Sequence, residues 1–232
     1  MVRAIIFDGD DTLWHTEQLY DEARSRAREI VEEAGLDGER WEARERAIDV
    51  ENVARFGHSS ERFPTSCVEA YEEACAESGQ PLDEKVRERI GAIARTVFER
   101  PAPLVDNARR TLEGLRSQGI ALALLTKGDT AVQRLRVEQS GLAPLFDLVD
   151  IVEEKTPESI LSVLKRLGVP TSAALTVGNS VRSDVFPSLA AGVKPVWIDA
   201  HVWEYEREHD SPPQDDVIKR KELSDLLEMF PR

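Results

Sequence analysis

Features that mark secreted, membrane-bound or zinc-stabilised proteins are missing from this sequence or scarce in it. Its 232 residues include two cysteines, Cys67 and Cys75, eight positions apart in a helix-patterned stretch, too far for one disulfide to bridge. No Cys and His residues have zinc-site spacing, no apolar run approaches the roughly 18 residues of a membrane span, and no signal-peptide pattern follows Met1. We therefore expect reduced cysteines and a cytoplasmic protein.

Positive charge is also scarce. Lys and Arg number 30 against 44 Asp and Glu, so the formal net charge is −14. Such an acidic surface repels polyanions, and we therefore expect neither nucleic acid nor an anionic membrane as a partner. A phosphate-bearing ligand would have to be attracted by local cations and backbone amides, which directs attention to the loops.

Short apolar runs rich in branched residues predict buried strands along most of the chain. Helix-patterned stretches separate the later runs, and this alternation is typical of a parallel sheet with right-handed crossovers. A shorter run near Val217 predicts an edge strand, followed by an amphipathic helix over residues 223–230. We predict an α/β fold with a Rossmann-like, doubly wound parallel sheet. The main strands are expected at residues 2–7, 120–125, 148–152, 174–177 and 193–198.

The alternation stops between residues 14 and 100, where the sequence is charged and helix-patterned throughout. Apolar residues recur there at helical spacing, and Gly35 and the Gly79-Gln80-Pro81 segment supply stops. This pattern predicts a helical domain, residues 14–100, inserted into a core made of residues 1–13 and 101–232. Its helices are expected at residues 19–34, 41–54, 65–78 and 82–98.

Polar clusters follow the first four predicted strands. Ligands of parallel α/β sheets bind beyond the carboxyl ends of the strands, so we expect these clusters to converge. They comprise Asp8-Gly9-Asp10-Asp11-Thr12-Leu13, Thr126-Lys127-Gly128-Asp129, Glu153-Glu154-Lys155-Thr156-Pro157 and Gly178-Asn179-Ser180 through Asp184.

These clusters resemble, in order and content, the four motifs of the haloacid dehalogenase superfamily. The resemblance covers essentially the whole chain, and the helical insertion is similar to the cap of the C1 subgroup. One position departs from the pattern, because Asn179 stands where the fourth motif usually has Asp. The matching residues are Asp8, Asp10 and Thr12 in the first motif, Thr126 in the second, Lys155 in the third, and Gly178 and Asp184 in the fourth.

The resemblance implies magnesium-dependent hydrolysis of a small phosphate monoester, which makes a small phosphorylated metabolite the expected partner. Asp8 would be the nucleophile that forms an aspartyl phosphate, and Asp10 the general acid and base. Thr126 would hold phosphoryl oxygens, and Lys155 would offset the negative charge of Asp8 and the phosphate.

Mg²⁺ prefers about six oxygen ligands, some of them water. The resemblance implies a site formed by Asp8, the backbone carbonyl of Asp10, Asn179 and Asp184. The amide of Asn179 can bind the metal through its oxygen but adds no negative charge, so we expect weaker metal binding than with Asp at this position.

Substrate selection is expected from the residues that open the helical insertion, Trp14 and His15, from Lys127, and from Arg62 at the end of the loop 55–62. A solvated interhelical loop explains Arg62 equally well. A calcium loop starting at Asp8 fails on spacing, because its sixth position is Leu13 instead of Gly.

Other functions remain open. A 2-haloacid dehalogenase of this superfamily typically lacks the second aspartate, here Asp10. A sugar mutase shares all four motifs and differs only in the acceptor of the phosphoryl group. The chain could also be a non-catalytic binding protein that kept the fold but lost turnover, and the change from Asp to Asn179 would then have accompanied that loss.

Overall fold

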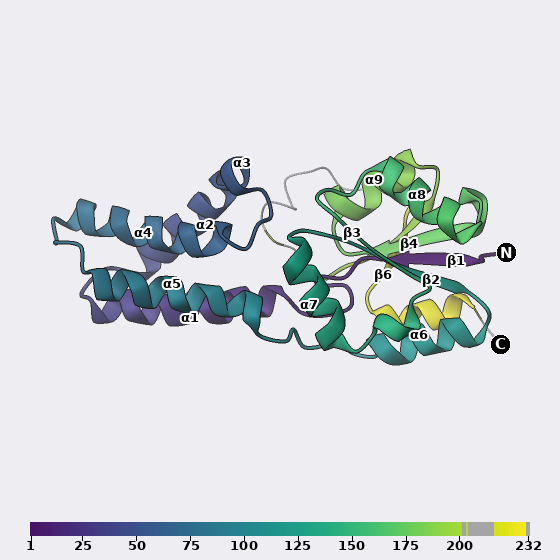
Figure 1. Cartoon of the computed structure of the whole chain (residues 1–232), viewed down its shortest axis with the longest axis horizontal. Helices are drawn as coiled ribbons and strands as arrows, with labels where there is room; N and C mark the ends of the chain where they lie inside the picture. Colours follow the sequence, from purple (N-terminus) through teal and green to yellow (C-terminus); the bar gives the residue numbers. More distant parts are fainter. Residues whose placement is uncertain (201–202, 204–215, 231–232) are drawn as a thin grey trace. The chain divides into compact units, whose positions relative to one another are not determined.

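The computed structural model of the chain describes residues 1–200, 203 and 216–230. It consists of two compact units, Met1–Glu17 with Pro101–Arg232, and Gln18–Arg100 (Figure 1). The first boundary lies four residues later than predicted, because the turn after the first strand packs into the sheet unit. There, Trp14 pairs with Leu104 and the His15 amide donates to the Pro103 carbonyl at 2.7 Å.

The sheet unit contains the predicted doubly wound parallel sheet. Its six strands lie in the order β3-β2-β1-β4-β5-β6, all neighbours are parallel, and the sixth strand lies at an edge as predicted. The strands are β1 (Ala4–Phe7), β2 (Ala121–Lys127), β3 (Leu148–Val152), β4 (Ala174–Gly178), β5 (Lys194–Ile198) and β6 (Ile218–Arg220). The strand order reverses between β1 and β4, where such sheets open a ligand crevice.

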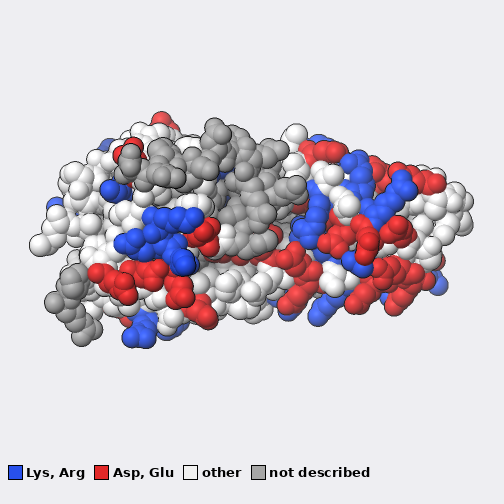
Figure 2. All heavy atoms as spheres, turned by 180° about the vertical axis from the view of Figure 1, so that it is seen from behind, with Lys and Arg blue, Asp and Glu red and all other residues white. Residues whose placement is uncertain are grey.

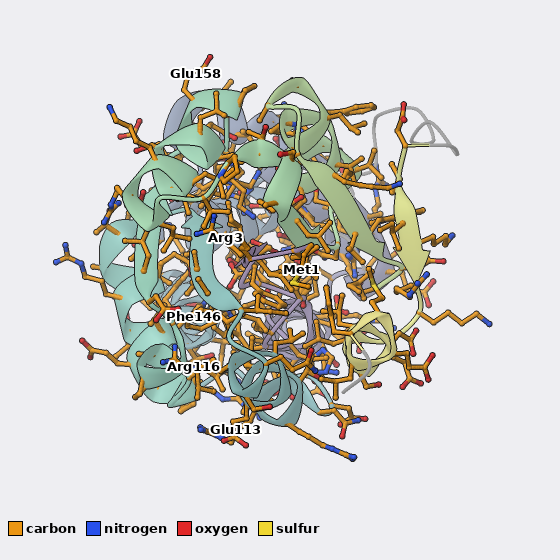
Figure 3. The ribbon with its side chains drawn as sticks, turned by 90° about the vertical axis from the view of Figure 1, so that its right-hand side faces the viewer. Met1, Arg3, Glu113, Arg116, Phe146 and Glu158 are labelled. Atoms are coloured by element: carbon orange, nitrogen blue, oxygen red, sulfur yellow. The ribbon has the colours of Figure 1, made fainter. Side chains whose placement is uncertain are left out.

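Helices cover both faces of this sheet. Side chains of a strand alternate between faces, so Ile5 and Phe7 of β1 join one hydrophobic cluster and Ala4 and Ile6 the other. Figure 3 views the strands end-on near Met1 and Arg3, with Glu158 on one side and Glu113 on the other. The helices are α6 (Ala108–Ser117), α7 (Thr130–Ser140), α8 (Pro157–Leu167) and α9 (Phe186–Ala190). The predicted C-terminal helix forms as a 3₁₀ helix, Leu223–Met229, packed on α6.

The second unit is helical, and its helices lie close to the predicted positions. They are α1 (Glu17–Glu33), α2 (Gly38–Glu51), α3 (Val53–Phe56), α4 (Arg62–Ser78) and α5 (Glu84–Glu99). Helix α3 falls partly in the segment expected as a loop, and both cysteines are buried free thiols in α4, as predicted. Acidic and basic side chains intermingle on the face in Figure 2. No helix within the described ranges is long and apolar enough to cross a membrane.

The interior of the helical unit contains charged side chains. Arg24 is 2% exposed, donates to Glu45 at 2.9 Å, and lies against the rings of Tyr20 and Phe63. Glu45 is fully buried, and this burial raises its pKa to about 7 although Arg24 opposes the shift. The folded protein therefore binds a proton at Glu45 more tightly than the unfolded chain does, so its stability depends on pH.

We expect Glu45→Gln to remove part of this pH dependence. The wild-type contribution is present below the ordinary pKa of 4.5 and is lost as pH rises through about 7. It amounts to at most about 3 to 4 kcal/mol, at about 1.4 kcal/mol per pKa unit. Urea unfolding between pH 5 and 8 should show a steeper fall for the wild type than for Glu45→Gln. Parallel curves would exclude Glu45 as a source of the dependence.

Candidate active site

The turn after β1 presents two of its three aspartates to the strand ends. The amides of Thr12 and Leu13 donate to the Gly9 carbonyl at 3.2 and 2.8 Å, which closes the turn. Gly9 has no room for a side chain, because its Cβ would lie 2.5 Å from the Trp14 ring. Asp11 instead caps the start of α1, where its carboxylate accepts from the Thr16 amide at 2.9 Å and the Thr16 hydroxyl at 2.7 Å.

Asp8 shares one ammonium group with Asp184. Lys155 Nζ contacts Asp8 Oδ1 and lies 2.6 Å from Asp184 Oδ1, and all three side chains are less than one-tenth exposed. Burial raises the pKa of Asp8 to about 7, Lys155 opposes this shift, and Asp184 adds to it. Burial alone would lower the pKa of Lys155, but Asp184 and Asp8 together raise it. The ammonium group therefore stays charged beside the proposed nucleophile.

The fourth motif places Asn179 and Asp184 next to this pair. Asp184 lies in the short helical turn η3 (Val181–Val185) and accepts from the Ser180 amide at 2.9 Å. Gly178 must be glycine, since a Cβ there would lie 2.2 Å from Asp184 Cγ. The Thr12 hydroxyl is 3.1 Å from Asp8 Oδ2 and 3.2 Å from Asn179 Oδ1, so it connects the first motif to the fourth.

These side chains form an oxygen-donor set that fits Mg²⁺. Asp8 and Asp184 supply carboxylates and Asn179 supplies an amide oxygen, all of them hard ligands suited to this ion. Within the part of the chain that the structure describes, no cluster of three or more His, Cys, Asp or Glu side chains could hold a metal. The set therefore carries fewer charges than a site built from three carboxylates.

Thr126 is the next-to-last residue of β2 and carries a buried hydroxyl. Its Oγ1 has no hydrogen-bond partner among the described residues, although the side chain is 1% exposed. Leaving such a group unpaired is costly, and a phosphoryl oxygen would satisfy it. Next to it, Lys127 Nζ lies 2.7 Å from the Ser183 hydroxyl and 3.9 Å from Glu154. Lys127 thus adds a second cation beside the fourth motif.

Asp10 is held by Trp14 and by two side chains of α7 that the sequence did not single out. Its Oδ2 accepts from Gln133 and Arg136 of α7, each at 2.8 Å, and its Oδ1 accepts from the Trp14 indole at 2.6 Å. Gln133 and Arg136 are buried on the inner face of α7. No periodic pattern identifies them in the sequence, because periodicity marks the inner face of a helix only when that face is apolar.

Two residues that were predicted to contact substrate are buried. Trp14 is 1% exposed and belongs to the sheet unit's core, so it supports Asp10 instead of lining an opening. Arg62 begins α4 instead of lying in a loop, and its side chain is 7% exposed and 3.5 Å from Asp49 in the helical unit. His15 is half-buried, and its role in substrate binding stays a prediction.

Comparisons with known proteins show the family to which the chain belongs. The model of the haloacid dehalogenase-like hydrolases matches residues 2–192. Phosphoserine phosphatase of Thermus thermophilus is 30% identical over 99% of this chain and 98% of its own. Glyceraldehyde 3-phosphate phosphatase of Methanopyrus kandleri is 27% identical over 98% and 97%. The crystal structure of a haloacid dehalogenase-like family hydrolase from Xanthomonas campestris superposes with a TM-score of 0.78 at 26% identity, covering 98% of this chain and 94% of that one. The chain therefore belongs to the haloacid dehalogenase-like hydrolases.

Proposed function

We propose that this hydrolase is a magnesium-dependent phosphatase that cleaves a small phosphate monoester through an aspartyl phosphate on Asp8. The observation that carries the proposal is the buried Asp8 carboxylate in contact with the Lys155 ammonium and close to the first-motif partner, Asp10. The relatives named above act, by their names, on phosphoserine and glyceraldehyde 3-phosphate, both small phosphate monoesters. We further propose that the helical unit, Gln18–Arg100, serves as the cap that selects the substrate.

The reaction has two steps, and each conserves its protons. In the first, an Asp8 oxygen bonds to phosphorus, the bond from phosphorus to the ester oxygen breaks, and Asp10 gives that oxygen a proton. In the second, Asp10 takes a proton from water as the water oxygen attacks phosphorus, and the bond to Asp8 breaks. Lys155 offsets the charge of Asp8, and the Thr126 hydroxyl donates to a phosphoryl oxygen.

Mg²⁺, held by Asp8, Asn179, Asp184 and the Asp10 carbonyl, would supply positive charge where the phosphate dianion meets the carboxylate. The retained aspartate, Asp10, argues against the dehalogenase alternative, whose halide leaving group needs no proton. A mutase would pass the phosphoryl group to a sugar hydroxyl instead of water.

Hydrolysis of an aryl phosphate with and without magnesium tests the proposal. We expect metal-dependent release of phosphate, an acid-stable trapped phosphoprotein, and further turnover with phosphoserine, sugar phosphates or nucleotides. A phosphoprotein that decays only when a sugar acceptor is added would identify a mutase. No metal-dependent hydrolysis of any of these compounds would overturn the proposal and favour the binding-protein alternative.

Thr126→Val should separate activity from stability. Valine has nearly the same shape and lacks the hydroxyl, which forms no hydrogen bond with any described residue. The free energy of unfolding should therefore stay equal or rise by about 1 kcal/mol. We expect kcat/KM to fall about 10² to 10³-fold, as when one donor to a developing charge is lost. Thermal unfolding and aryl phosphate kinetics give both values, and unchanged kinetics would place the hydroxyl away from the phosphate.

A further inference from the structure

The Asp10 carboxylate is almost saturated with hydrogen bonds before any substrate is present. A carboxylate offers about four lone-pair sites, two on each oxygen. Gln133 Nε2 and Arg136 Nη1 occupy Oδ2, each at 2.8 Å, and Trp14 Nε1 occupies one site of Oδ1 at 2.6 Å. The remaining site lies on Oδ1. The side chain is still 31% exposed, so it can reach a solvent molecule or ligand.

The donors on α7 are fixed in place by their surroundings. Gln133 is 2% exposed, and its Nε2 also donates to the Lys127 carbonyl at 3.0 Å, which ties it to the end of β2. The helix itself starts at the Asp129 cap, which accepts from the Ala131 amide at 2.9 Å. Arg136 lies one turn after Gln133 and is 6% exposed. Both donors therefore approach Asp10 from a rigid element.

Burying an arginine and a glutamine on the inner face of one helix is unfavourable, and one hydrogen bond from each to Asp10 offsets part of that cost. Leu or Met at these positions would pack α7 on the sheet without a polar partner. Among the residues that the structure describes, Gln133 and Arg136 both donate a hydrogen bond to the Asp10 carboxylate. Their shared partner suggests a reason for polar side chains here that goes beyond packing.

We propose that Arg136 and Gln133 are positioning residues that fix the Asp10 carboxylate, together with Trp14, so that Oδ1 exchanges the proton. This inference rests on the proposed phosphatase function. Oδ1 gives its proton to the ester oxygen in the first step and takes one from water in the second, so the carboxylate returns to its starting state. Oδ2 stays bonded to α7 throughout, which prevents the carboxylate from rotating away from the reacting oxygens.

Arg136→Met is the first test, with Arg134→Met as its matched control. Arg134 is exposed on the same helix and does not contact Asp10. We expect Arg136→Met to lower kcat for an alkyl phosphate about 10- to 100-fold, within the contribution of general acid catalysis, with KM changed less than about threefold. The single-turnover release of nitrophenol from an aryl phosphate should change much less, because its leaving group needs little proton. Arg136→Lys should restore part of the loss.

Two results would overturn the inference. One is an equal loss for alkyl and aryl substrates, which indicates a merely structural role for Arg136. The other is an unchanged or higher kcat with alkyl substrates, which would mean that Asp10 reaches its productive position without Arg136. If Arg136→Met does not fold, Gln133→Met takes its place, because it removes a neutral donor at nearly constant volume. It should likewise lower kcat for alkyl phosphates more than for aryl phosphates.

A double-mutant cycle distinguishes failure of this inference from failure of the proposed function. In an Asp10→Asn background, adding Arg136→Met should cost less than about threefold, because Arg136 acts through the carboxylate that is already gone. A full additive loss would contradict the positioning role. If Asp10→Asn itself retains wild-type turnover of alkyl phosphates, the proposed acid and base is wrong, whatever Arg136 does.

Discussion

Asp8→Asn should lower kcat by about 10⁴-fold or more while the protein remains folded. An amide has nearly the shape of the carboxylate but is a poor nucleophile, and losses of this order follow removal of a catalytic nucleophile. Lys155 keeps Asp184 as its partner at 2.6 Å, so the substitution leaves no buried ammonium without a carboxylate. Aryl phosphate kinetics, thermal unfolding and phosphoprotein trapping together measure the effect.

Asp11→Asn is the matched control for this experiment. Asp11 lies in the same turn, and burial raises its pKa, but its carboxylate bonds to Thr16 and Glu17 instead of facing the site. Asparagine is as good a helix cap as aspartate, so both activity and stability should stay close to the wild type. Retained phosphoprotein formation in Asp8→Asn, or equal losses in the two variants, would remove Asp8 from the mechanism.

The convergence of the four motifs could be predicted because it follows from topology. Parallel strands end on one edge, so residues just after β1, β2, β3 and β4 must meet there whatever lies between them. Lys155 contacts both Asp8 and Asp184 for this reason, although 147 positions separate it from Asp8 in the sequence. The direction of each side chain was not needed for that prediction.

The partners of Asp10 could not be predicted by the same reasoning. Gln133 and Arg136 lie inside α7, and which face of a helix turns inward depends on packing that periodicity resolves only when the inner face is apolar. Trp14 was assigned to substrate because it opens the helical insertion, but its ring packs so closely on Gly9 that a Cβ there would lie 2.5 Å from it. Arg62 was placed in a loop because the helical pattern was recognised only from residue 65, whereas α4 begins at Arg62.

Asn179→Asp should tighten magnesium binding. Asn179 Oδ1 shares the Thr12 hydroxyl with Asp8, so a carboxylate at 179 would add its charge beside the other proposed ligands. At an effective dielectric near 20, a unit charge about 4 Å from an opposite one contributes up to roughly 4 kcal/mol before desolvation is subtracted. About 1.4 kcal/mol of that would already be a tenfold gain in affinity. The Michaelis constant for substrate should not improve in parallel, because the same charge repels the phosphate dianion.

Metal-free Asn179→Asp should also be less stable than the wild type, and magnesium should restore it. Without metal, a third carboxylate would join Asp8 and Asp184 around the single ammonium of Lys155. The magnesium-induced rise in Tm should therefore be larger in the variant, which gives a measure of metal binding that does not depend on turnover. Gln139→Glu is the control: it makes the same amide-to-carboxylate change on the exposed end of α7 and should leave both magnesium responses unchanged. An identical magnesium half-saturation and Tm rise in Asn179→Asp and the wild type would place Asn179 outside the metal's reach.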